Sequence, residues 1–120
     1  WASGNSRINL NMPFIERSGS TRFEVEFEND DQITTGMLTG TISRRVARLI
    51  RIWRHDDLGY RGLGGELLER FEAWAIFHGA VRWEAHFGPD EDRRSEALDF
   101  YNRHGVKYIQ AEAKLTKTLT

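Results

Sequence analysis

The sequence predicts one α/β domain of the α+β-like kind, with a mixed central sheet flanked by helices. Three observations predict it. Short runs in which apolar and polar residues alternate, such as Phe23 to Phe27, are typical of half-buried strands. Two longer runs, which end at His78 and His104, carry apolar side chains at helical spacing. A length of 120 residues, with 39% hydrophobic and 29% charged residues, is typical of a single globular domain.

The N-terminal third is predicted to consist of strands. Trp1 to Ser6 are interpreted as an expression remnant, a flexible start or the start of an excised domain, because the chain begins without Met. Arg7 to Glu16 alternates apolar and polar residues but contains a proline, which allows an edge strand at best. Thr21 to Glu28 predicts a half-buried strand with an acidic outer face, and Met37 to Ser43 predicts the next strand.

The run Val46 to Arg54 predicts a central strand, because it carries apolar side chains on both faces. Strict alternation places Ile50 and Ile52 on one face and Leu49 and Trp53 on the other. A strand that is apolar on both sides is usually covered on both sides. We therefore expect this strand to lie inside the sheet.

Four glycines follow this strand within the seven residues Gly59 to Gly65. Glycine allows backbone N–H groups to turn inward without clashes of a Cβ atom. The helix that begins there adds unpaired N–H donors and the positive end of its dipole. The loop is therefore predicted to cradle a phosphate or pyrophosphate. The helix runs to His78, where Gly79 ends it.

The last 40 residues predict a strand, a second helix and a closing pair of strands. Val81 to Phe87 alternates apolar and polar residues, and Ser95 to His104 has helical spacing with Gly105 as its end. Val106 to Gln110 and Lys114 to Leu119 predict the closing strands.

Composition excludes several classes of function. The absence of cysteine excludes a disulfide frame, a thiolate metal site and a cysteine nucleophile. A net charge of −1 makes nucleic-acid binding improbable, and no apolar run approaches the ~20 residues that span a bilayer. We expect a cytoplasmic protein. We also expect that it binds no metal, because its four histidines lack metal-ligand spacing: His55, His78, His86 and His104.

The order of strand, glycine loop, helix, strand and second helix resembles the GCN5-related N-acetyltransferases, the GNAT family. The resemblance covers Phe23 to Leu119. Gly62 and Gly64 occupy the two small positions of the family loop Q/R-x-x-G-x-G/A. The segment Ala97 to Val106 looks like the family pattern A-x-x-F-Y-x-x-x-G-F.

The resemblance implies that acetyl-CoA lies between strands Val46 to Arg54 and Val81 to Phe87. Its pyrophosphate would lie on N–H groups of the glycine loop, and its pantetheine would pair with the backbone of the first strand near its end. The residues so assigned to the cofactor are Ile52, Trp53, Arg54, Gly59, Tyr60, Arg61, Gly62, Leu63, Gly64 and Gly65. Tyr101 stands where the family places a proton donor for the leaving thiolate; the alternative is an aromatic side chain that only packs the helix on the sheet.

The base that accepts the proton of the amine is left open by the sequence. Glu84 and His86 share one face of their strand and could act as base, or they could form a solvated face opposite Trp83. The triplet His55-Asp56-Asp57 follows the central strand and could relay a proton or bind an amine. Strand Val46 to Arg54 itself carries no carboxylate.

Two departures from the family pattern bear on function. Gly59 stands where the family has Gln or Arg. Either Arg61, two residues later, supplies the cation, or the loop is shifted by one residue relative to the family pattern. The N-terminal part is also too short for the usual pair of helices that cover the substrate. This predicts an open acceptor side, or a lid supplied by a homodimer or a partner domain.

The function that this pattern predicts is transfer of an acetyl group from acetyl-CoA to a primary amine of a small molecule or protein, by direct attack in a ternary complex. The alternative is a non-catalytic GNAT-like module that binds CoA or a protein partner.

Overall fold

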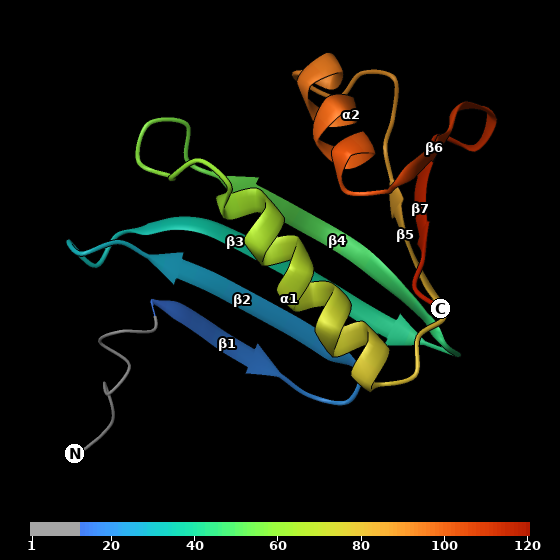
Figure 1. Ribbon diagram of the computed structural model, residues 1–120, viewed down its shortest axis with the longest axis horizontal. Helices are drawn as coiled ribbons and strands as arrows, with labels where there is room; N and C mark the ends of the chain where they lie inside the picture. Colours follow the sequence, from blue (N-terminus) through green and yellow to red (C-terminus); the bar gives the residue numbers. More distant parts are fainter. Residues whose placement is uncertain (1–12) are drawn as a thin grey trace.

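A computed structural model of the chain describes residues 13–120, which form one seven-stranded sheet with two helices (Figure 1). The strands lie in the order β1-β2-β3-β4-β5-β7-β6, and all neighbours are antiparallel except β4 and β5. The predicted α/β class with a mixed sheet is confirmed. The elements are β1 (Phe14–Ser18), β2 (Arg22–Glu28), β3 (Thr34–Ser43), β4 (Val46–Arg54), α1 (Leu63–Phe77), β5 (Arg82–His86), α2 (Arg94–Arg103), β6 (Lys107–Ile109), a 3₁₀ turn (Gln110–Glu112) and β7 (Lys114–Thr118).

The N-terminal predictions are only partly covered by the described residues. Trp1 to Ser6 lie outside them, as does the predicted strand before Pro13. The later part of that strand is β1, which pairs with β2 at the edge of the sheet, as the proline in the run indicated. Among the described residues, no helix is long and apolar enough to cross a bilayer.

The first four strands form a meander whose turns follow from local chemistry. Between β2 and β3, the Asn29 side chain accepts hydrogen bonds from the N–H groups of Asp31 and Ile33, at 2.9 and 3.0 Å. This is the Asx turn that asparagine favours. On β2, Phe23 and Val25 are fully buried while Glu24 and Glu26 are not, as the alternation predicted.

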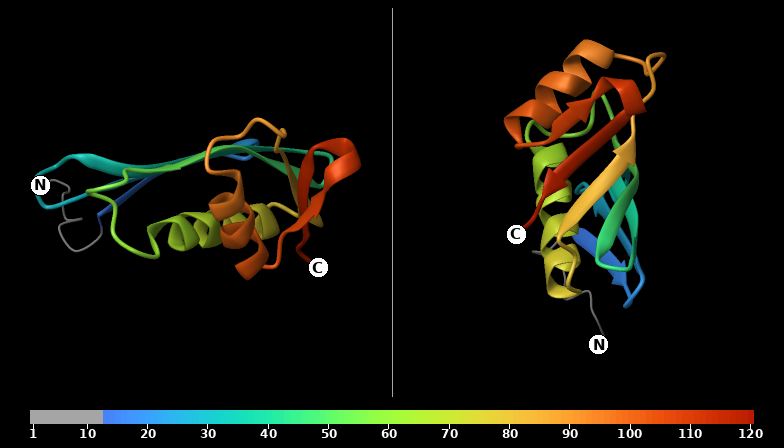
Figure 2. Two further views of the ribbon diagram at one scale, coloured as in Figure 1. Left: turned by 90° about the horizontal axis from the view of Figure 1, so that it is seen from above. Right: turned by 90° about the vertical axis from the view of Figure 1, so that its right-hand side faces the viewer.

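Both helices lie on the same side of the sheet, and the described residues place no helix on the other (Figure 2). The core lies between α1 and the sheet, where Phe23, Leu38, Phe71 and Trp83 have no exposed surface. α1 approaches β3 closely because of Gly40: a Cβ atom there would overlap the Phe71 ring. The predicted shortage of N-terminal helices therefore leaves one face of the sheet uncovered in residues 13–120.

The central position of β4 is confirmed, but the predicted division of its side chains between the two faces is wrong. Thr39 pairs with Arg51 and Gly40 with Leu49, so Ile50 forms a β-bulge. The bulge shifts the alternation by one residue. Leu49 therefore shares the α1 side with Ile52, and Ile50 is 62% exposed.

A polar network ties α1 to the C-terminal half of the sheet. One carboxylate oxygen of Glu72 accepts a hydrogen bond from the indole N–H of Trp83 at 2.7 Å, and the other pairs with the Lys117 ammonium at 2.9 Å. The indole would otherwise be a buried donor without an acceptor, which is costly. Glu72 thus connects α1 with both β5 and β7.

Candidate functional site

A cleft opens where β4 and β5 separate. The two strands pair only at Val46↔Arg82, Ala47↔Trp83 and Arg48↔Glu84, after which β4 continues alone. The bulge at Ile50 begins at this point. The cleft measures about 1570 Å³ and is lined by the end of β4, the glycine loop, the start of α1 and one side of α2.

The side chains of His55 and Arg54 hold the turn between β4 and the glycine loop. The His55 Nδ1 atom accepts hydrogen bonds from the N–H groups of Asp57 and Leu58, at 3.1 and 3.0 Å. The Arg54 guanidinium donates to the Gly59 carbonyl at 3.1 Å. A Cβ at Gly59 would lie 2.7 Å from the His55 carbonyl oxygen, so glycine is needed here for close packing. Arg54, expected to contact the cofactor, also braces the loop.

The glycines predicted to cradle an anion lie at the start of α1. Gly62 precedes the helix with φ of 95°, a conformation that favours glycine. The first helical hydrogen bond is donated by Glu66 to the Gly62 carbonyl, and Leu63 donates to Tyr60. Among residues 13–120, the N–H groups of Gly64 and Gly65 have no acceptor. They point along the helix axis with the positive end of its dipole, as an anion site requires.

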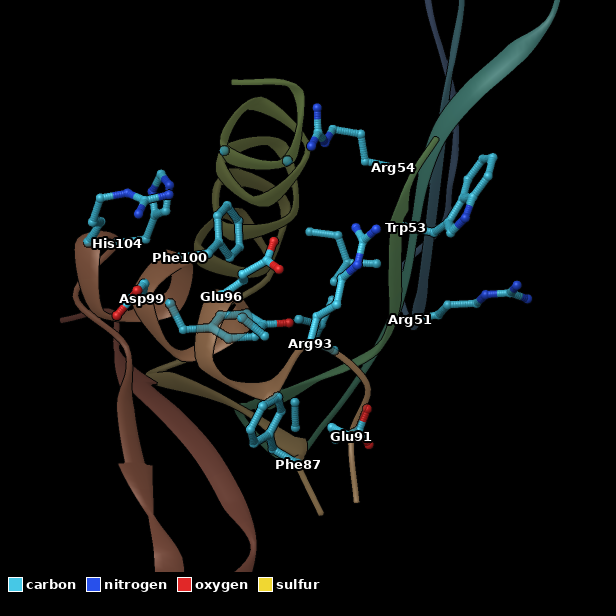
Figure 3. A pocket seen from close by; sticks show the side chains of 18 of the residues that line it. Arg51, Trp53, Arg54, Phe87, Glu91, Arg93, Glu96, Asp99, Phe100 and His104 are labelled. Atoms are coloured by element: carbon cyan, nitrogen blue, oxygen red, sulfur yellow. The ribbon is translucent and has the colours of Figure 1, made fainter. Parts of the chain in front are cut away.

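Gly64 and Gly65 are also the surfaces on which α2 packs. A Cβ at Gly64 would lie 3.2 Å from the Phe100 ring, and one at Gly65 would lie 2.8 Å from Cε1 of His104 (Figure 3). The requirement for glycine at these positions therefore comes from α2 as well as from any phosphate. This contact places His104 beside the cradle, a position that sequence reasoning did not predict.

Two other predicted cofactor residues have structural roles, and a third lies on the open face of the sheet. The Leu63 side chain has no exposed surface and belongs to the core. The Tyr60 ring packs edge-on against Phe27 with 5.0 Å between centroids, and its hydroxyl bonds to Glu66. The Trp53 side chain lies on the sheet face away from the helices and is 39% exposed, which contradicts the expected cover on both faces of the strand (Figure 3). Arg61 lines the cleft and is exposed.

Tyr101 lies on α2 and lines the same cleft. Its ring packs against Trp83 and Phe87, with centroids 6.4 and 6.1 Å apart, and only 8% of the residue is exposed. Within the described part of the chain, its hydroxyl has no hydrogen-bond partner. Burial, and then the negative charge of Glu91, raise the pKa of Tyr101 to about 12. The hydroxyl is therefore protonated at neutral pH and can donate into the cleft.

Glu84 and His86 are separated by the structure. Glu84 does not line the cleft and is paired with Arg82 at 2.9 Å and with Lys114 at 3.4 Å. The hydrogen bond from Arg82 and the charge of Lys114 hold the pKa of Glu84 below its usual value, against the opposing effect of burial. A carboxylate stabilised in this way is a poor base. His86 is exposed and does line the cleft.

An ion pair joins the two sides of the cleft. Arg93, at the start of α2, forms two parallel hydrogen bonds with the Asp56 carboxylate, at 2.7 and 2.9 Å. These bonds and the charge of Arg93 lower the pKa of Asp56. Both side chains are 58% exposed, so the pair contributes little to the stability of the fold. Its effect is to hold the start of α2 against the loop that follows β4. Its members lie 37 positions apart in the sequence, and no local pattern indicates this pair.

The comparisons with known proteins support the fold. The structure is similar to the PaiA N-acetyltransferase of Thermoplasma acidophilum in complex with coenzyme A, with a TM-score of 0.68 and 17% identity over 82% of this chain and 61% of that chain. It is also similar to a GNAT acetyltransferase of Staphylococcus aureus, with a TM-score of 0.71 and 13% identity over 84% and 70%. The structure is similar to Tetrahymena GCN5 as well, with a TM-score of 0.65 and 10% identity over 83% of this chain and 69% of that chain.

These likenesses show that the chain has the GNAT fold. The chain spans 61% of the Thermoplasma protein, which is less than two thirds of its length. No family model matches the sequence, and no curated protein matches it either.

Proposed function

We propose that the chain transfers an acetyl group from acetyl-CoA to a primary amine in a ternary complex. The observation that carries this proposal is the cleft between β4 and β5. Within residues 13–120, it presents N–H groups without an acceptor at one end and the Tyr101 hydroxyl without a partner at another part of its wall. The GNAT fold and the CoA bound by the Thermoplasma protein support it.

The cleft fits an acyl-CoA. The free N–H groups of Gly64 and Gly65 suit a pyrophosphate, with Arg61 exposed nearby. The backbone of β4 beyond Arg48 has no partner in β5, so Ile52 to Arg54 can pair with an extended chain as a further strand would. Bound there, acetyl-CoA would supply the thioester that the amine attacks.

The residues of the chain would move two protons. We assign to Tyr101 the proton that the leaving sulfur needs, because its hydroxyl stays protonated and faces the cleft. We assign to His86, directly or through water, the proton of the attacking amine, because it lines the cleft and is reached by solvent. Glu84, tied to Arg82 and Lys114, has no place in this scheme.

A non-catalytic CoA-binding or protein-interaction module is the second candidate. The uncovered face of the sheet and the lack of a carboxylate on the cleft-lining part of β4 favour it. The two functions are separated by measuring thiol release from acetyl-CoA with a panel of amines, and thermal stabilisation by CoA. We expect both. Stabilisation without release on any amine would support the module, and no stabilisation would overturn the cofactor assignment.

Replacing Gly64 with valine is expected to raise the Kd of CoA by about tenfold or more. The new side chain would meet the Phe100 ring and cover the N–H groups of the cradle, which disturbs the packing of α2 on α1. Calorimetric titration with CoA measures the effect. Gly19→Val is the matched control, because no atom lies within 4 Å of a Cβ at that position. Equal affinities in the two variants would show that the loop is not the phosphate site.

A further inference from the structure

The sheet face away from the helices, here called the outer face, is crossed by a row of three residues from neighbouring strands (Figure 2). Thr39 of β3 lies opposite Glu24 of β2 on one side and opposite Arg51 of β4 on the other. Residues opposite each other in a sheet point to the same face. Phe23 and Val25, which flank Glu24, are fully buried in the core beside α1, so Glu24 points away from the helices. Figure 3 shows that the Arg51 side chain also points away from them.

Glu24 and Arg51 carry opposite charges that residues 13–120 leave unpaired. Two strand spacings, roughly 10 Å, separate them across Thr39, which is too far for an ion pair within one chain. Neither side chain forms an ion pair with any other described residue. Arg17, which lies opposite Glu24 on β1, is engaged with Glu26 at 3.1 Å. The outer face therefore presents a negative and a positive charge side by side, each without a counter-ion in the described part of the chain.

Beside this row lie two side chains of the kinds that protein interfaces favour. Met37 of β3 lies opposite Glu26 on one side and Trp53 on the other, so it belongs to the next row of the outer face. Trp53 is 39% exposed, and Figure 3 shows it on the same side of the sheet as Arg51. Tryptophan, methionine and arginine are enriched where proteins bind one another. The centre of the outer face thus combines such contact residues with the two charges.

The charges determine how two copies of this face fit together. If the two-fold axis runs along β3 between two stacked sheets, β2 of each copy lies over β4 of its partner. Glu24 then meets Arg51 of the partner subunit, and the symmetry repeats this pair. If the axis runs across the strands instead, each strand lies over its own counterpart, and identical charges meet. Because only the first arrangement brings opposite charges together, the outer face is complementary to itself in that one orientation.

Two features limit the strength of this contact. One neighbouring row places Arg22 over Arg48 of the partner subunit, although each Arg48 also lies 3.9 Å from a carboxylate oxygen of Glu84 in its own chain. Strands β1 to β4 have 5 to 10 residues each, so at ~3.3 Å per residue and ~4.8 Å between strands they present roughly 500 Å² per copy. A total of about 1,000 Å² is at the lower end for specific interfaces. We therefore expect a dimer with a Kd in the micromolar range.

We propose that the outer face of β1 to β4 binds a second copy of this chain, with Glu24 of each copy paired with Arg51 of the partner subunit. Arg51 and Trp53 also line the cleft between β4 and β5. The second copy therefore forms a wall of that cleft and narrows the side from which a ligand enters. A homodimer is one of the sources of a lid that the short N-terminal part of the sequence predicted. The inference does not depend on acetyl transfer, because the quantity that tests it is a molecular mass.

Sedimentation equilibrium from micromolar to millimolar concentration is expected to show a mass that rises from one chain to two. Glu24→Arg and Arg51→Glu should each raise the dimer Kd about tenfold or more, because each places like charges at both symmetric contacts. An equimolar mixture of these two variants should recover the dimer, since opposite charges then meet at both contacts. The double variant should recover it as well. The matched controls are Asp99→Arg and Arg103→Glu, which reverse exposed charges on α2 and should leave the Kd unchanged.

A protein that stays monomeric at millimolar concentration would overturn the inference. A dimer that Glu24→Arg and Arg51→Glu leave intact would also overturn it, because that dimer would use another surface, such as the edge of β1. The same holds if both single variants lose the dimer and neither the mixture nor the double variant recovers it. Salt gives a measurement that needs no variant: raising it from ~0.05 to ~0.5 M should weaken the dimer severalfold, since the ion pairs lie at a partly exposed face. A Kd that salt does not change would contradict these pairs.

Discussion

Replacing Tyr101 with phenylalanine is expected to lower kcat for acetyl transfer by about 100-fold with little change in the Kd of CoA. The substitution removes one oxygen that has no partner among residues 13–120 and keeps the ring between Trp83 and Phe87. The leaving thiolate would then lack its proton donor. Steady-state kinetics with acetyl-CoA, combined with calorimetric titration of CoA, separates the two quantities.

Tyr108→Phe is the control for this prediction, because the Tyr108 hydroxyl is bound to Arg94 and does not line the cleft. Its kcat should stay near that of the unaltered protein. Equal kcat in Tyr101→Phe would remove Tyr101 as the acid and leave it as a packing residue of α2.

The raised pKa of Tyr101 gives the same variant a second use. An ultraviolet titration of the three tyrosines should contain one component with a pKa of about 12 that is missing in Tyr101→Phe. An alkylamine loses its proton near pH 10.4, well below that value. Activity should therefore rise with pH as the amine becomes neutral, without a fall caused by Tyr101 until the pH approaches its pKa. A fall near pH 10 that disappears in Tyr101→Phe would contradict the burial argument.

Replacing Gly40 with alanine is expected to lower the free energy of unfolding by about 3 kcal/mol. The added Cβ would overlap the Phe71 ring and lie 2.9 Å from the Arg48 carbonyl oxygen of β4. Because one of these obstacles is backbone, a side-chain rotation cannot relieve it. The loss corresponds to a fall in Tm on the order of 10 °C.

Chemical denaturation measures this effect, and Gly19→Ala provides the comparison, because its Cβ meets no atom within 4 Å. The control should stay within about 0.5 kcal/mol of the unaltered protein. Equal stability of the two variants would mean that α1 can move away from β3 at no cost, which a fully buried Phe71 argues against.

Most strands and helices could be predicted from the sequence, because each has a clear pattern of apolar and polar residues. The alternation of Phe23, Val25 and Phe27 and the apolar spacing of α1 depend on neighbouring residues only, so their strand and helix were predicted within a few residues. The prediction of which β4 side chains share a face was wrong from Ile50 onward. The bulge there depends on the pairing of β4 with β3, and the order of apolar and polar residues in the sequence does not indicate it. For the same reason, Trp53 and Leu49 lie on opposite faces of the sheet, although strict alternation placed them on one face.

The candidate site was predictable where it rests on one segment and not where distant segments meet. The place of the glycine loop at the start of α1 and the position of Tyr101 in the cleft follow from local motifs. The contacts of Gly64 with Phe100 and of Asp56 with Arg93 join residues more than 30 positions apart, and no periodicity indicates them. The pairing of Glu84 with Lys114 likewise needed the arrangement of β5 beside β7.

The separation of β4 from β5 also divides the sheet into two parts that we expect to form at different stages of folding. Strands β1 to β4 follow one another directly, so each pairing closes a short loop. Strand β5 pairs with β7 and touches β4 at only three residue pairs, across the whole of α1. The entropy of closing the longer connections delays that second part. We therefore expect the meander of β1 to β4 to form first and the cleft between β4 and β5 to form last.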